Sequence, residues 1–223
     1  MDNVNSFENL NKVNMSSSFY EAKDKCVYIL LSKTSTLPSD VIQMWTKEPY
    51  AHTSLAFDIE LNEMYSFARK KLHNPFRCGF IEEDITSGVF GRDVDTVCRV
   101  CRLCVTETQY NKIRNIIEDF KKESSYYKYN YLGIVGIMCN KAVERKYNYF
   151  CSQFVYYVLE NAGVEMFGKE PGLTRPEDFR QWDKLELIYE GKLIDYRKFL
   201  HNEYMKNKSH DEGYIEYKKT VGE

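Results

Sequence analysis

Three cysteines recur at every third position in the sequence, as Cys98-x-x-Cys101-x-x-Cys104. This is the start of a bacterial ferredoxin motif, in which a further cysteine belongs at the next position of the pattern and thiolates hold an iron–sulfur cluster. Thr108 stands at that position, and residues 96–105 are rich in strand-forming side chains. In a strand, Cys98 and Cys104 lie on one face and Cys101 on the other, so the three thiols cannot hold one metal ion. The spacing therefore predicts structural cysteines, with no metal and no cofactor.

Cys151 has a different setting, because it follows the pair Tyr149-Phe150 and begins a helical pattern that runs to Ala162. A thiol at a helix N-terminus faces the positive end of the helix dipole, which lowers its pKa. A neighbouring imidazole would lower that pKa further and carry a proton to a leaving group. The residues alone leave two interpretations open, a buried space-filling cysteine and a nucleophile.

The chain has four histidines, and only one of them opens an apolar strand-like run. His201 and His210 lie in a charged segment near the C-terminus, and His73 lies in a lysine-rich loop. His52 precedes the run of residues 53–56, where an imidazole needs either a hydrogen-bonding partner or a chemical role. His52 is therefore the candidate general base.

Tyrosines alternate with a lysine in the run from Tyr126 to Tyr131, a pattern that can stack the bases of a single-stranded nucleic acid. Such binding also needs a wide basic groove, whereas 33 acidic residues against 31 basic ones give the chain a net charge of −2. We expect the run to pack and to anchor a loop, and we expect no nucleic-acid partner.

A chain of 223 residues with 43% apolar and 29% charged residues is typical of one globular domain that needs no disulfide. The first residues are polar, and the longest apolar stretch, residues 26–31, is far shorter than the ~20 residues of a membrane span. We therefore expect a cytoplasmic protein without a transmembrane segment, in which all seven cysteines are reduced. The sequence does not determine the oligomeric state.

Strand-like runs come first and helical patterns later, which favours an α+β fold with an antiparallel β-sheet packed against helices. The expected strands are residues 25–32, 52–58, 63–68 and 95–105, with a closing hairpin of 185–189 and 192–196 around Glu190-Gly191. The expected helices begin at residue 38, after a capping box at 106–109, near residues 131–139, and at residues 151 and 176. We expect a single domain over residues 25–200, with a flexible arm (1–24) before it and a charged, frayed tail (201–223) after it.

A histidine strand at residues 52–55, a later cysteine helix at residues 149–155 and the segment 175–179 together resemble the circularly permuted papain-like cysteine amidase and peptidase superfamily. That superfamily includes permuted relatives of cell-wall amidases and, more distantly, the lecithin retinol acyltransferase type. In papain the cysteine precedes the histidine, whereas here the histidine comes first, as in the permuted members. The resemblance covers residues 25–196.

The resemblance implies an antiparallel sheet packed on the Cys151 helix, with His52 on a facing strand as general base and later acid. Members cleave or transfer acyl groups at amide, ester or thioester carbonyls through an acyl-enzyme, and the backbone N–H of Cys151 would help to hold the oxyanion. We therefore expect a thiol hydrolase or acyltransferase that acts on a small molecule, a peptide or a lipid-like acyl substrate. A peptidoglycan amidase is an alternative within this class.

Many members of the superfamily place a Glu or another polar residue on the strand after the histidine strand, where it orients the imidazole. The matching position here holds Ser66, whose hydroxyl stabilises an imidazolium far less than a carboxylate would. Glu83, further along the chain, is the alternative third catalytic residue. This departure keeps open a second class of function, a non-catalytic binding module or pseudoenzyme that kept the fold.

Overall fold

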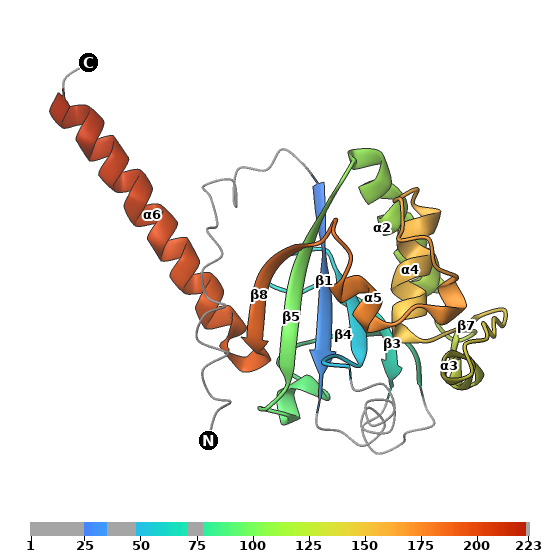
Figure 1. The fold of residues 1–223 in the computed structure, drawn as a ribbon. Helices are drawn as coiled ribbons and strands as arrows, with labels where there is room; N and C mark the ends of the chain where they lie inside the picture. The colour runs from blue at the N-terminus through green and yellow to red at the C-terminus, as the bar shows by residue number, and fades with distance from the viewer. Residues whose placement is uncertain (1–24, 35–47, 71–77, 222–223) are drawn as a thin grey trace. The chain divides into compact units, whose positions relative to one another are not determined.

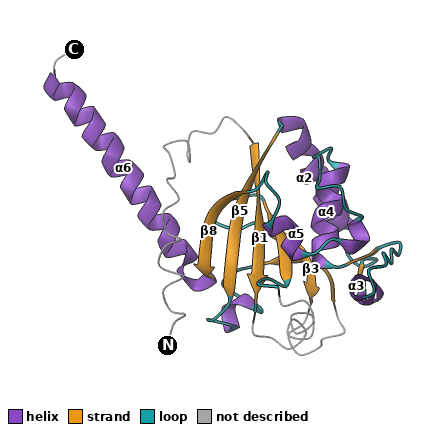
Figure 2. Cartoon of the chain, viewed as in Figure 1, coloured by secondary structure: helices purple, strands orange, loops and turns teal. Residues whose placement is uncertain are grey.

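The computed structural model describes residues 25–34, 48–70 and 78–221, and its fold class is α+β (Figures 1 and 2). The residues from Asp24 to Lys198 form one compact unit, which contains a six-stranded sheet and several helices. The second unit includes most of helix α6 (Tyr196–Val221). None of the helices in the described ranges has the length and apolar character that a membrane crossing requires.

The sheet is antiparallel throughout, in the order β4-β3-β2-β1-β5-β8. Its strands are β1 (Lys25–Lys33), β2 (His52–Ala56), β3 (Met64–Arg69), β4 (Cys78–Glu83), β5 (Val97–Val105) and β8 (Glu186–Lys192). The strands expected at β1, β2, β3 and β5 are confirmed. A separate parallel pair joins β6 (Lys128–Tyr129) to β7 (Asn148–Tyr149).

Helices α2 and α4 pack against the sheet together (Figure 1). The helices described in this unit include α2 (Glu107–Lys122), α3 (Tyr131–Met138), α4 (Cys151–Asn161) and α5 (Pro176–Arg180), with 3-10 turns η2 (Phe90–Arg92), η3 (Pro171–Leu173) and η4 (Leu193–Asp195). The capping box expected before α2 is confirmed: Thr106 Oγ1 accepts from the Gln109 N–H, and Gln109 Oε1 accepts from the Thr106 N–H.

Aromatic side chains fill the space between the sheet and these two helices. Phe67 of β3, Phe80 of β4, Phe120 of α2 and Phe154 of α4 contact one another with ring centroids 5.1 to 6.1 Å apart. Rings packed at such distances contribute burial and specific edge-to-face contacts. The cluster therefore fixes α4, whose first residue is Cys151, relative to the sheet.

The closing hairpin expected around Glu190-Gly191 is wrong, because the chain continues through these residues as one strand. β8 pairs with β5 as far as Lys192, and η4 follows it. A Cβ atom on Gly191 would lie 2.7 Å from the Tyr189 hydroxyl oxygen. The glycine therefore permits a close approach of Tyr189 inside the strand and does not form a turn.

The C-terminal segment expected to be a frayed tail is instead helical as part of α6. Lys and Glu recur in this segment, and these residues favour a helical backbone. The helix expected to begin at residue 38 and the expected arm of residues 1–24 lie outside the described residues.

Strand alternation separates the cysteine triplet, as expected from its spacing. Cys101 is opposite Ile29 of β1, whose side chain belongs to the core under the helices, so Cys98 and Cys104 point to the other face. Cys104 Sγ lies 3.2 Å from Cys26 Sγ on the neighbouring strand. Within the described residues, no three His, Cys, Asp or Glu side chains converge as metal ligands.

Helix α3 is attached to the rest of the unit through the buried side chain of Asn130. Its Oδ1 accepts a hydrogen bond from the Gly133 N–H at 3.0 Å, which caps the first turn of α3. Its Nδ2 donates to the Val143 carbonyl at 2.8 Å and to Gln153 Oε1 at 3.3 Å. Because Gln153 lies in the first turn of α4, Asn130 joins α3 to the helix start that carries Cys151.

Replacing Asn130 by alanine should lower the free energy of unfolding by about 1–3 kcal/mol, because the Gly133 N–H and the Val143 carbonyl lose a buried partner. Chemical denaturation followed by circular dichroism measures this loss. Asn161→Ala is the matched control, since the Asn161 amide donates to the Tyr157 carbonyl in an exposed position. We expect the control to change the free energy by about 0.5 kcal/mol or less, and equal losses in both variants would contradict the anchoring role.

Candidate active site

Cys151 is the first residue of α4 and follows Phe150, which has an extended backbone. The Phe150 N–H donates to Gln153 Oε1 at 3.4 Å, and Ser152 Oγ donates to the Thr174 carbonyl at 2.7 Å. These hydrogen bonds fix the helix start, which keeps the N–H groups of its first turn aimed out of the helix end. Cys151 is only 4% exposed, so its thiol lies in a setting of low dielectric.

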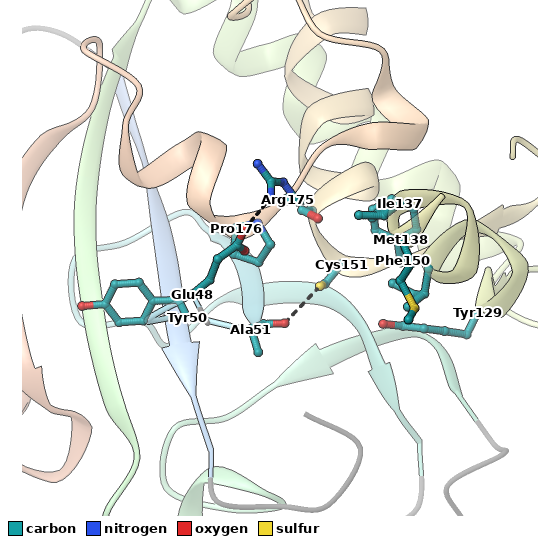
Figure 3. A pocket seen from close by; sticks show the side chains of 12 residues that line it. Glu48, Tyr50, Ala51, Tyr129, Ile137, Met138, Phe150, Cys151, Arg175 and Pro176 are labelled. Carbon is teal, nitrogen blue, oxygen red and sulfur yellow. Dashed lines mark hydrogen bonds and ion pairs between the residues drawn. The ribbon is translucent and has the colours of Figure 1, made fainter. Parts of the chain in front are cut away.

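The Cys151 thiol faces the start of β2. Its Sγ atom lies 4.0 Å from the carbonyl oxygen of Ala51, the residue that precedes His52 (Figure 3). His52 Nε2 lies 3.0 Å from Glu83 Oε1, and Ser54 Oγ donates to Glu83 Oε2 at 2.5 Å. Because Nε2 engages Glu83, Nδ1 is the imidazole nitrogen left to face the thiol.

Ser66, the first candidate for orienting His52, makes no hydrogen bond to the imidazole. Its side chain is fully buried on β3, and its Oγ makes no hydrogen bond to any residue that the structure describes. The hydroxyl still helps to lower the pKa of Glu83. Glu83, the alternative candidate, is therefore the residue that binds His52 directly.

Burial opposes charge on both members of the His52–Glu83 pair, and their mutual attraction overcomes it. Burial lowers the pKa of His52, but the Glu83 carboxylate and the Cys151 thiol together raise that pKa well above its ordinary value. Burial raises the pKa of Glu83, but His52 and the Ser54 hydroxyl bring that pKa below its ordinary value. The side chains are 20% and 8% exposed, so water and salt screen the pair weakly.

The pKa of Cys151 is also lowered against the effect of burial. Burial alone would raise it, but hydrogen bonding to His52, the charge of His52 and backbone groups of Thr53 and Ser152 reverse the direction. A lowered thiol pKa beside a raised imidazole pKa favours transfer of the thiol proton to the imidazole. The thiolate is the form of a cysteine that reacts as a nucleophile.

Tyr129 enters the site from β6, and its hydroxyl points toward Cys151 (Figure 3). Burial and the nearby Cys151 raise its pKa well above the ordinary value of a tyrosine, so the phenol keeps its proton. A neutral hydroxyl here can donate a hydrogen bond to an oxyanion, which would form on a carbonyl group attacked by the thiol. The sequence does not indicate that Tyr129 lies here, because only the pairing of β6 with β7 brings it to Cys151.

A pocket with a mostly apolar lining opens beside Cys151 (Figure 3). Ile137 and Met138 of α3 form part of one wall. On another side, Arg175 Nη1 donates to Glu48 Oε1 at 2.6 Å. An apolar wall of this kind suits the hydrocarbon part of a small ligand.

The structure thus brings together three residues that the sequence singled out, Cys151, His52 and Glu83, and adds Ser54 and Tyr129 to them. A scan of protein-family models and searches of curated proteins and of solved structures each found no match to this chain.

Iodoacetamide should alkylate Cys151 at lower pH than an ordinary thiol, because the thiolate is the reacting species and the pKa of Cys151 is lowered. The rate should rise as the pH increases through this lowered pKa. In His52→Ala the main cause of the lowering is removed, so the rise should move to higher pH. Mass spectrometry of peptides from a time course follows each cysteine separately.

Two other cysteines serve as internal controls in the same samples. Burial raises the pKa of Cys98, which should react slowly over the whole range, and Cys139 reports an exposed thiol. If Cys139 reacts faster than Cys151 at acidic pH, or if His52→Ala leaves the Cys151 profile in place, the thiol is not activated.

Proposed function

We propose that this protein is a cysteine-dependent hydrolase or acyltransferase that acts on an amide, ester or thioester through an acyl-enzyme on Cys151. One observation carries the proposal: the thiol interacts with His52, whose Nε2 lies 3.0 Å from the buried Glu83 carboxylate. A nucleophile, a base and a group that orients the base recur in this arrangement in acyl-transfer enzymes of unrelated fold.

In the first half of the reaction, the Cys151 thiolate attacks the carbonyl carbon, a C–S bond forms, and an electron pair moves onto the carbonyl oxygen. The backbone N–H of Cys151 and the Tyr129 hydroxyl are the donors available to this oxyanion. The His52 imidazolium then gives its proton to the leaving group as the bond between that group and the carbonyl carbon breaks. A thioester of Cys151 remains.

In the second half, neutral His52 takes a proton from the molecule that attacks the thioester. The C–S bond breaks, the Cys151 thiolate returns and His52 is again an imidazolium, which closes the cycle. Attack by water makes the protein a hydrolase, and attack by an alcohol or amine makes it an acyltransferase. Glu83 stays ionised throughout and holds the imidazole in place.

Membership of the permuted papain-like superfamily is part of this proposal. In its favour, the helix that begins at Cys151 packs against an antiparallel sheet, and the strand that begins at His52 comes earlier in the chain. The argument for a binding module was the lack of an acid at the position of Ser66, and the contact of Glu83 with His52 weakens that argument. A cytoplasmic location also belongs to the proposal.

Glu83→Gln should lower kcat/KM on a p-nitrophenyl ester by about 10²- to 10⁴-fold, the range of a general acid–base contribution. Glutamine keeps the size of the side chain but removes the charge that raises the pKa of His52. The alkaline limb of the pH–rate profile should therefore move to lower pH. Ser66→Ala is the control and should change kcat/KM only slightly; a larger effect at Ser66 than at Glu83 would assign the orienting role to Ser66.

Tyr129→Phe should lower kcat on the same ester by about 10²-fold, because it removes one donor to the oxyanion. Iodoacetamide forms no oxyanion, so its rate with Cys151 should change little. Tyr147→Phe, at an exposed tyrosine, is the matched control for turnover. A parallel loss of turnover and alkylation in Tyr129→Phe would mean that the phenol acts on the thiol and not on the oxyanion.

A further inference from the structure

Helix α3 presents an apolar face to solvent. Its eight residues include no charged side chain. Tyr131, Leu132, Val135 and Met138 are 45%, 54%, 55% and 38% exposed. Tyr131, Val135 and Met138 follow one another at spacings of four and three, which places them on one side of the helix next to Leu132. We call these four residues the α3 surface, and exposed apolar clusters of this kind mark interaction sites.

The rotation of α3 about its own axis is fixed, so it cannot turn the α3 surface inward. A Cβ atom on Gly133 would lie 2.5 Å from Asn130 Nδ2, and one on Gly136 would lie 2.4 Å from the Lys141 carbonyl oxygen. These two glycines form the buried side of the helix, where the chain packs too closely for any side chain. The exposure of the α3 surface therefore follows from the packing of the opposite side.

Basic residues flank helix α3 along the chain. Between residues 126 and 147 the chain has four basic residues and one acidic residue, Glu144, although the whole chain has a net charge of −2. The four basic residues, all exposed, are Lys128, Lys141, Arg145 and Lys146. Lys146 Nζ lies 4.8 Å from the centroid of the exposed Tyr147 ring.

We propose that the α3 surface docks on an anionic phospholipid membrane, with α3 lying in the plane of the interface. Aliphatic side chains would enter the acyl boundary, tyrosines would lie at the depth of the headgroups, and the basic flank would meet the phosphates. Eight residues of helix span about 12 Å, which suits shallow insertion and not crossing.

A second copy of the chain fits the α3 surface less well than a membrane does. In a two-fold contact the same patch serves both partners, so the net positive charge of residues 126–147 would meet the same charge on the other copy. An anionic surface instead attracts this charge. Charge complementarity therefore favours an anionic membrane over a second copy of the chain.

Docking at the α3 surface would place one wall of the pocket at the membrane. Met138 of this surface lines the pocket beside Cys151, together with Ile134 and Ile137 of the same helix. A lipid acyl group could then reach the thiol along α3. This consequence rests on the proposed acyl transfer, whereas the docking itself does not.

The test uses Cys151→Ala protein, so that membrane binding is measured without acyl transfer. Co-sedimentation should show binding to vesicles of phosphatidylcholine with phosphatidylserine, weaker binding to phosphatidylcholine alone, and a decline with added salt. The double variant Leu132→Glu, Val135→Glu should bind about tenfold more weakly or worse, because it removes buried apolar area and adds negative charge. Val94→Glu and Ile194→Glu are the controls, since these side chains are 59% and 63% exposed elsewhere and should not matter.

A fluorescent label gives a second measurement that needs no change on the α3 surface itself. An environment-sensitive dye on the exposed Cys139, at the C-terminal end of α3, should shift to the blue on the anionic vesicles. The same dye on the exposed Cys104 of β5 should not shift.

Three results would overturn the proposal: no binding of the Cys151→Ala protein to anionic vesicles, equal losses in the double variant and the controls, or equal dye shifts at Cys104 and Cys139. A dimer in analytical ultracentrifugation that the double variant dissociates would instead assign the α3 surface to a second copy. If the unsubstituted protein shows no esterase activity, this result counts against the proposed function and leaves the docking result intact.

Discussion

The contact between His52 and Glu83 is the constraint on which the candidate site depends. Two ionisable groups that are largely buried remain charged only while each holds the other, and removing one partner of such a pair typically costs about 3–5 kcal/mol of stability. The two residues lie on β2 and β4, with β3 between them, so three strands must keep their register for the contact to exist. In an antiparallel sheet this register also decides which face each side chain takes, because a slip by one residue would turn Glu83 away from the imidazole.

Helix α4 supplies the other half of the site, and the aromatic cluster under it fixes where the helix begins. Because Phe154 packs among rings from β3, β4 and α2, the first residue of α4 stands at the start of β2 beside His52. The pKa of Cys151 then follows from the position of its thiol. Burial raises the pKa of a thiol, and only a close positive charge and donor groups lower it again, so the low pKa of Cys151 exists because strand and helix meet at this point.

Helix α3 links this site to the surface of the unit. Asn130 ties it to the first turn of α4, and its glycine side packs closely against the chain that follows. One short helix therefore contributes Ile137 to the pocket wall beside Cys151 and exposes Val135 on its outer side. An apolar helix held in this way keeps its outer side exposed.

Signals that are local in the chain were enough to determine a good part of this protein. Alternation and β-branched content gave the central strands, the capping box located α2, and the position of Cys151 at a helix start could be inferred from a single helical pattern. Tertiary structure decided the rest. The sequence could not choose between Ser66 and Glu83, because that choice depends on how β4 pairs with β3. The sequence also does not predict that Tyr129 lies beside Cys151 or that β8 continues through Gly191. Both features depend on pairing with a strand that is remote in the chain. A helix cap or a periodic face involves neighbours in sequence, whereas a catalytic constellation joins side chains that only the packed sheet and helices bring together.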